Sequence, residues 1–236
     1  MDHLSALGTY LTDGYFAAKC SMPKVGYNWP VSQRSWNSLP LDFEPRNYLN
    51  PSDTNKALKR RIASWWPTAN VKQQCEVARW VISDWGGIRT NKVETIARYV
   101  KMANEVSPTT PILGVASYSK ILAFTRPNSF AIYDARVAAA LNALQLKCVP
   151  EYKRLYFKDI AGRNSKVESF KKRFSIMGYP TKGFRPISPN EVYSSYLALL
   201  QIMSSRLPSY TIEDFEMELF TAAVDICDAA CELSRS

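Results

Sequence analysis

Apolar side chains in this chain recur every three or four residues, and this spacing restricts the fold more than any other feature of the sequence. It is the spacing of a helix that turns one face toward a core. No segment shows the strict alternation of apolar and polar residues that predicts a half-buried strand. We therefore expect an all-α fold. The clearest apolar faces comprise Val71, Cys75, Ala78, Ile82 and Trp85; Val93, Ile96, Ala97, Val100 and Ala103; Val192, Tyr196, Leu199, Leu200 and Met203; and Ile212, Phe215, Leu219, Ala222, Ile226 and Ala230.

Histidine and cysteine are too few and too scattered for several kinds of active site. The single histidine is His3, and the five cysteines form no CxxC pair. Catalytic triads and His/Cys zinc sites need such residues in clusters. We therefore expect neither a metal nor an organic cofactor, and any catalysis has to use carboxylate, lysine or tyrosine side chains.

The N-terminal sequence indicates where the protein is located in the cell, and the length limits the number of domains. The first residues, MDHLSALGTYLTDG, contain an early acid and no long apolar run, so we expect a cytoplasmic protein without a signal peptide or a membrane span. A length of 236 residues, 46% of them hydrophobic, fits one large domain or two small lobes.

The segment LGVASYSKILAFTRPNSFAIYDARV, residues 113–137, combines a glycine turn with a capped helix. Gly114 can adopt a backbone conformation closed to other residues, and the N–H groups that begin the next helix can bind an anion such as phosphate. Pro127 ends that helix. Asp134 then occupies an N-cap position, where its carboxylate can accept hydrogen bonds from the N–H groups two and three residues later.

This arrangement resembles the helix-hairpin-helix DNA glycosylases, most closely their prokaryotic 8-oxoguanine DNA glycosylase-like branch. The resemblance covers roughly residues 70–145. It implies a two-lobed helical fold and a hairpin at Gly114-Val115-Ala116 that grips the DNA backbone. It also implies that Asp134 is the catalytic carboxylate, although capping a helix is an alternative role for this residue.

The chain departs from the family pattern at two positions. The last residue of the hairpin is Ala116 where the family has glycine. The bifunctional members carry a nucleophilic lysine at the position that Tyr118 fills here, and Lys120 follows two residues later. Lys120 is therefore a candidate either for a Schiff-base nucleophile with weak lyase activity or for a partner of a phosphate or carboxylate.

The family layout suggests three segments along the chain. Residues 21–53 contain five prolines and several aromatic residues, and we expect this segment to pack across the surface of the fold as a strap. The resemblance places the chain ends together in one lobe. The expected segments are residues 1–67, which pack with the C-terminal lobe; residues 68–147, the central helix-hairpin-helix lobe; and residues 148–236, the basic segment and the C-terminal helices.

Positive charge is concentrated between Pro150 and Arg185, a segment that contains ten Lys or Arg residues and only three acidic residues. A segment of this density favours a polyanionic partner and binding that weakens as salt rises. We expect Lys171, Lys172 and Arg173 to contact DNA. The alternative is a solvated helix face over an apolar stripe.

The sequence-level hypothesis is a DNA glycosylase that flips a damaged or modified base out of duplex DNA, excises it and leaves an abasic site. Tyr133, Trp85 and Tyr118 are candidates for the base pocket. The substrate is either an 8-oxoguanine-like lesion or a bulky modified cytosine, such as the glucosylated hydroxymethylcytosine of phage DNA. No obligate protein partner is expected. The alternatives are a non-catalytic helix-hairpin-helix DNA-binding module and a helical adaptor for RNA or protein.

Overall fold

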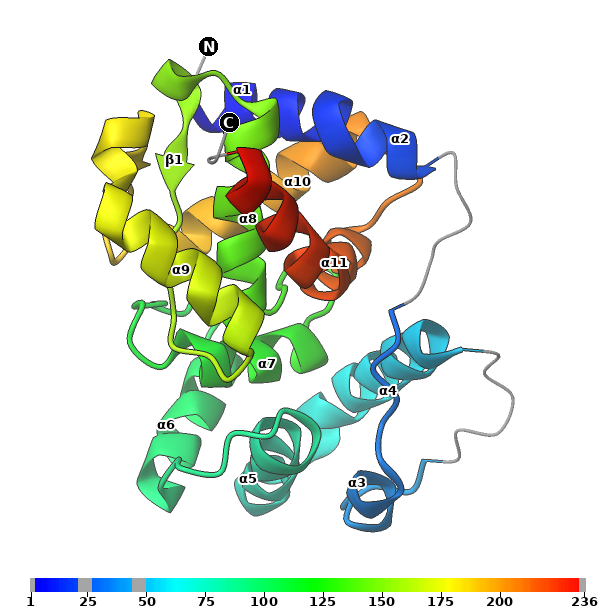
Figure 1. Ribbon diagram of the computed structural model, residues 1–236. Helices are drawn as coiled ribbons and strands as arrows, with labels where there is room; N and C mark the ends of the chain where they lie inside the picture. The colour runs from blue at the N-terminus through cyan, green and yellow to red at the C-terminus, as the bar shows by residue number, and fades with distance from the viewer. Residues whose placement is uncertain (1–2, 21–26, 44–49, 234–236) are drawn as a thin grey trace. The chain divides into compact units, whose positions relative to one another are not determined.

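The computed structural model describes residues 3–20, 27–43 and 50–233, and these residues are predominantly helical (Figure 1). The expected all-α class is thereby confirmed. The described strands are limited to β1 (Leu155–Tyr156) and β2 (Arg185–Pro186), which pair in parallel. Among the described residues, no helix has both the length and the apolar character needed to cross a membrane.

The chain forms two compact units, and each unit combines segments that are distant in the sequence. The described residues of the first unit lie within positions 1–26, 110–113 and 133–236. Those of the second unit lie within positions 27–109 and 114–132. The chain therefore passes between the units several times, and neither unit is a continuous stretch of sequence.

These boundaries differ from the three expected segments. Residues 27–67 belong to the second unit, because the long helix α4 (Pro51–Trp65) packs against α7 (Val115–Thr125). Residues 133–147 belong to the first unit, because α8 (Ala135–Cys148) packs against the last helix of the chain. The prolines in the sequence mark where helices end, but they do not determine which apolar faces cover one another.

The central helix of the first unit is α8, which is buried along most of its length. Helices α1, α9 and α11 all pack against it, and its many alanines allow this close approach (Figure 1). The other elements of this unit are α1 (His3–Leu11), the π-helical turn η1 (Thr12–Phe16), α2 (Ala17–Cys20), the short turns η4 (Glu151–Lys153) and η5 (Tyr179–Lys182), α9 (Ser165–Met177), α10 (Val192–Arg206) and α11 (Ile212–Leu233).

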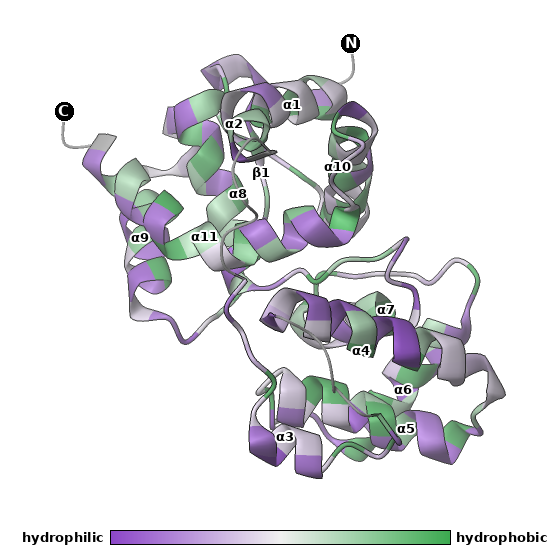
Figure 2. Cartoon of the chain, turned by 90° about the vertical axis from the view of Figure 1, so that its right-hand side faces the viewer, coloured by the Kyte–Doolittle hydropathy of each residue, from purple (hydrophilic) through white to green (hydrophobic). Residues whose placement is uncertain are grey.

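The second unit is built around α7, whose residues are almost all buried. Helix α4, helix α6 (Val93–Asn104) and the π-helical turn η3 (Trp80–Trp85) pack against it. Figure 2 shows hydrophobic and hydrophilic positions interleaved along the helices, as expected for amphipathic helices around a core. The remaining elements are α3 (Gln33–Asn37), the turn η2 (Trp66–Thr68) and α5 (Val71–Arg79).

The proline-rich region at 21–53 is only partly described, since residues 21–26 and 44–49 lie outside the described residues. The described part includes the short helix α3 and is fastened to the second unit by hydrogen bonds. The hydroxyl of Ser35 donates to the carbonyl of Asp84 at 2.8 Å, and the indole of Trp80 donates to the carbonyl of Ser35 at 2.8 Å. The expected strapping is therefore present for this part, on the second unit.

Two buried amide side chains on α8 hold the extended segment that contains β1. The Asn142 amide donates to the carbonyl of Phe157 at 2.7 Å and accepts from its N–H at 3.0 Å. The Gln145 amide pairs in the same way with Leu155, at 2.8 Å and 2.7 Å. These reciprocal pairs satisfy backbone groups that burial would otherwise leave unpaired. They fix the segment along α8.

Candidate active site and hairpin

Asp134 is the N-cap of α8, as its sequence context predicts. Its backbone is extended, with φ −131° and ψ −174°. One carboxylate oxygen, Oδ1, accepts hydrogen bonds from the N–H of Arg136 at 2.9 Å and from the N–H of Val137 at 3.1 Å. Within the described part of the chain, no hydrogen bond reaches the other oxygen, Oδ2. The cap therefore orients the carboxylate rigidly and leaves one oxygen available.

Buried tyrosines surround the start of α8. Burial raises the pKa of Tyr196 well above its usual range, and the nearby carboxylates of Glu216 and Asp134 raise it further. The pKa of Tyr133 is also raised, chiefly by burial and then by acids that include Asp159 and Asp134. Both phenols therefore stay protonated at physiological pH and can act only as neutral groups. Within this cluster, Asp134 is the half-buried carboxylate that caps the helix.

The loop that contains Gly162 packs against the N-terminal end of α8. A Cβ atom added at Gly162 would lie only 2.6 Å from the Cβ of Ala135, the first residue of α8. The guanidinium of Arg136 lies 4.7 Å from the ring centroid of Phe220 on α11. The first turn of α8 is therefore packed by two other parts of the first unit, and this packing limits the movement of the Asp134 backbone.

The predicted hairpin residues Gly114-Val115-Ala116 lie in the second unit, at the N-cap and the first turn of α7. Gly114 has a φ of +81° and is the N-cap of α7, without a side chain to cap the helix. Its carbonyl accepts hydrogen bonds from the N–H groups of Ser117 at 2.9 Å and Tyr118 at 3.1 Å. The first N–H groups of α7, those of Val115 and Ala116, have no carbonyl within the helix to bind. The turn therefore has the geometry of an anion-binding helix start.

Lys120 is buried inside the second unit, where its side chain is only 5% exposed. Its Nζ donates a hydrogen bond to the carbonyl of Ala116, one turn earlier on the same helix, at 2.6 Å. Its alkyl stem lies against Gly86, where an added Cβ would be 2.7 Å from the lysine Cδ. The amine thus points back along its own helix, a position less suited to a nucleophile than the sequence suggested.

The aromatic candidates for the base pocket are largely core residues, which corrects the sequence-based expectation. Tyr118 and Tyr133 are 0% exposed, so neither ring has a free face on which a base could stack. The Tyr133 hydroxyl donates to the carbonyl of Lys158 at 2.9 Å. Trp85 is half-buried, and its indole N–H donates to Asn55 at 2.7 Å. Sequence spacing cannot separate these roles, because buried and ligand-binding aromatics occupy similar helical positions.

The three basic candidates on α9 differ in their environment. Lys171 is only 8% exposed, and its Nζ donates to Glu168 at 2.6 Å and to the carbonyl of Ile160. Its expected contact with DNA is therefore wrong for this conformation. Lys172 is exposed and Arg173 is half-buried. These two side chains remain able to reach a phosphate.

Comparison with known proteins gives no further guide to the site. No family model, no curated protein and no solved structure matches this chain. The assignment of roles therefore depends on the geometry of the molecule itself. Among the described residues, no group of three or more His, Cys, Asp or Glu side chains is placed to hold a metal ion.

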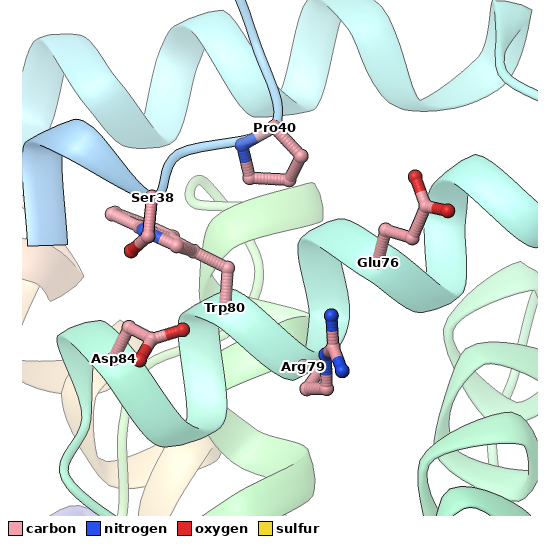
Figure 3. Close-up of a pocket in the computed structure, with 6 residues that line it drawn as sticks. All are labelled: Ser38, Pro40, Glu76, Arg79, Trp80 and Asp84. Atoms are coloured by element: carbon pink, nitrogen blue, oxygen red, sulfur yellow. The ribbon is translucent and has the colours of Figure 1, made fainter.

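A pocket of about 250 Å³ lies in the second unit and contains none of the predicted site residues (Figure 3). Two carboxylates, those of Glu76 and Asp84, accompany the guanidinium of Arg79 in its wall. This balance of charge does not suit a phosphate. The complete lining is Ser38, Pro40, Glu76, Arg79, Trp80 and Asp84.

Sequence reasoning missed Tyr99, whose hydroxyl lies beside Gly114. Tyr99 falls between Ile96 and Val100 on the apolar face of α6, and the spacing therefore identifies it only as a core residue. The position of its hydroxyl beside Gly114 is a feature that only the three-dimensional structure provides.

Proposed function

We propose that this chain is a DNA glycosylase that excises a damaged or modified base from duplex DNA, with Asp134 as its catalytic carboxylate. The main support for the proposal is the hydrogen bonding of that carboxylate. Its Oδ1 is held by two backbone N–H groups, whereas no hydrogen bond from the described residues reaches Oδ2. The cap thus fixes the direction of the carboxylate and leaves Oδ2 able to face a substrate, which supports the catalytic role.

The reaction needs little more than a fixed negative charge and a water molecule. Breaking the bond between the base nitrogen and C1′ of the sugar leaves positive charge on the sugar, which Oδ2 of Asp134 stabilises. The same oxygen orients the attacking water and accepts its proton. The water oxygen bonds to C1′ while the electron pair of the C1′–N bond leaves with the base. The base takes up one proton from solvent, Asp134 returns one proton to solvent, and the products are a free base and an abasic site. Removing the base from the helix beforehand costs a few kcal/mol.

The hairpin supports duplex DNA as the partner. Gly114 holds the start of α7 in a left-handed turn, and a helix N-terminus carries roughly half a positive charge. Such a turn positions a backbone phosphate without reading the base sequence. The resemblance implies an 8-oxoguanine-like lesion as the substrate, and a bulky modified cytosine of phage DNA is the alternative.

The direct test is to incubate the purified chain with genomic DNAs that carry different base modifications. Free bases are identified by mass spectrometry, and abasic sites are counted with a carbonyl-reactive probe. The proposal predicts that one modified base appears together with an equal number of abasic sites. Binding of duplex DNA without any released base would instead favour the non-catalytic helix-hairpin-helix module.

Lys120 is expected not to form a covalent intermediate. Its amine donates to the carbonyl of Ala116, and its stem is closed in by Gly86, so it is not directed toward a sugar. Borohydride added during the reaction should trap no protein–DNA adduct, and the abasic site should remain intact. The matched variant is Lys120→Met, which keeps a flexible apolar stem. A trapped adduct that disappears in this variant would show that Lys120 is the nucleophile.

Lys172 is expected to contact a phosphate, because it is the exposed lysine of the pair on α9. Replacing Lys172 by Ala should reduce the slope of log K against log salt by about one unit, as expected for the loss of one phosphate contact. Fluorescence anisotropy at several salt concentrations measures this slope. Lys147→Ala, at an exposed position near the end of α8, is the control for net charge. Equal slopes for Lys172→Ala and the wild type would show that the Lys172 side chain contacts solvent and not a phosphate.

A further inference from the structure

We propose that the hydroxyl of Tyr99 binds a backbone phosphate of duplex DNA together with the N-terminus of α7. This inference rests on the proposed function and adds a donor from a second helix, α6, to the hairpin. It thereby makes Tyr99 a positioning residue for DNA. Helices α6 and α7 pack against each other in the second unit (Figure 1).

The first support is the unusual placement of the hydroxyl. Tyr99 is only 5% exposed, and its ring packs edge-on against Tyr118 with centroids 5.8 Å apart. Its Cζ lies 3.1 Å from the position that a Cβ of Gly114 would occupy, and the hydroxyl lies closer still. Among the described residues, no hydrogen bond involves this hydroxyl. Although the ring is buried, the hydroxyl oxygen is not among the fully buried polar atoms that lack a partner, so it reaches solvent and is open to a ligand that accepts its O–H.

The second support is the N-cap residue of α7, Gly114, beside which the hydroxyl lies. Gly114 contributes no capping side chain, and its φ of +81° disfavours any other residue. Tyr99 excludes a side chain from the same space. The Tyr99 hydroxyl therefore lies beside the N-cap residue of α7, at the positive end of the helix.

The charge around this point favours an anion. The guanidinium carbon of Arg98 lies 5.6 Å from the ring centroid of Tyr99, on the exposed side of α6. A phosphate oxygen can accept from a hydroxyl and from backbone N–H groups at once, because each oxygen has several lone pairs. Donors from two helices restrict the direction of the phosphate more than one helix start does. Tyr99 thus fixes the register of the DNA backbone on the hairpin.

The test is the substitution Tyr99→Phe, measured by fluorescence anisotropy with a labelled duplex at several salt concentrations. Binding should weaken about tenfold, as expected for losing one hydrogen bond to a charged group. The salt slope should stay at the wild-type value, because a neutral hydroxyl displaces no counterion. Tyr118→Phe, in the neighbouring ring, is the control and should bind normally. Melting temperatures of all variants separate binding from folding.

A second measurement tests the geometry without DNA. An alanine at position 114 would place its Cβ against the Tyr99 hydroxyl, so Gly114→Ala should cost less stability in the Tyr99→Phe background than in the wild type. Wild-type affinity in Tyr99→Phe, with base release intact, would overturn the role of Tyr99 and leave the proposed function standing. A wild-type chain that binds no duplex would overturn both.

Discussion

Replacing Asp134 by Asn should abolish base release while leaving duplex binding nearly intact. An asparagine side chain still caps the helix, because its oxygen accepts from the same N–H groups of Arg136 and Val137. It carries no negative charge for the sugar and accepts no proton from water. The expected loss is about 10²–10⁴-fold in the rate of base release, the usual effect of removing an acid–base group. Single-turnover measurement of the free base gives this rate directly.

Asp134→Ala is the matched variant, because it removes the cap as well as the charge. It should be as inactive as Asp134→Asn, and it should also lose about 1 kcal/mol of stability. This pair of variants separates the catalytic role from the structural one. An Asp134→Asn variant that keeps more than roughly a tenth of the wild-type rate would remove Asp134 from the catalytic role.

Replacing Arg154 by Met should reduce the free energy of unfolding more than any other substitution proposed for this chain. The Arg154 guanidinium is buried at the C-terminal end of α8, where burial lowers its pKa. It donates to the carbonyls of Gln145 at 3.1 Å and Val149 at 2.9 Å, and to the carbonyl of Lys182 at 2.8 Å. The Gln145 carbonyl keeps the backbone N–H of Val149 at 3.1 Å, but the carbonyls of Val149 and Lys182 lose this donor, which should cost about 2–4 kcal/mol in the free energy of unfolding.

Thermal unfolding followed by circular dichroism should show this change as a melting temperature lower by roughly 4–12 °C. Arg154→Lys should recover only part of the loss, since a lysine lacks the planar fork of donors. The control is Lys153→Met at the preceding position, which should change the free energy of unfolding by less than about 0.5 kcal/mol. A stability of Arg154→Met equal to that of Lys153→Met would contradict the role given to this guanidinium.

The sequence predicts the helical class well, because periodic apolar spacing is a local property. The faces expected around Val71–Trp85, Val93–Ala103, Val192–Met203 and Ile212–Ala230 all lie in helices or helical turns of the structure. The cap at Asp134 was also predictable, since an N-cap depends only on the few residues that follow it.

The division into units was not predictable, because it depends on which helix faces meet. Residues 27–67 could have packed with either end of the chain, and only the contact between α4 and α7 assigns them. The hydrogen bonds from Asn142 and Gln145 to the segment with β1 are likewise non-local. Spacing alone gives no sign of them.

Lys171 and Lys120 show where charge alone misleads. Lys171 falls at helical spacing from Val167 and Phe174, so it lies on the same buried face of α9. That spacing was visible in the sequence, but positive charge in a basic segment suggested an exposed side chain. Lys120 belongs to α7, a helix buried on nearly every side, and no local pattern distinguishes this from a helix with one exposed face.

A count of abasic sites distinguishes a glycosylase from a module that only binds DNA. Purified protein is mixed with a duplex containing 8-oxoguanine and, separately, with phage DNA that carries glucosylated hydroxymethylcytosine, and abasic sites are counted with Asp134→Asn as the blank. We expect abasic sites in at least one of these DNAs with the wild-type protein and none above background with Asp134→Asn. Wild-type protein that leaves both DNAs without abasic sites, while still binding duplex DNA, would contradict the assignment as a glycosylase.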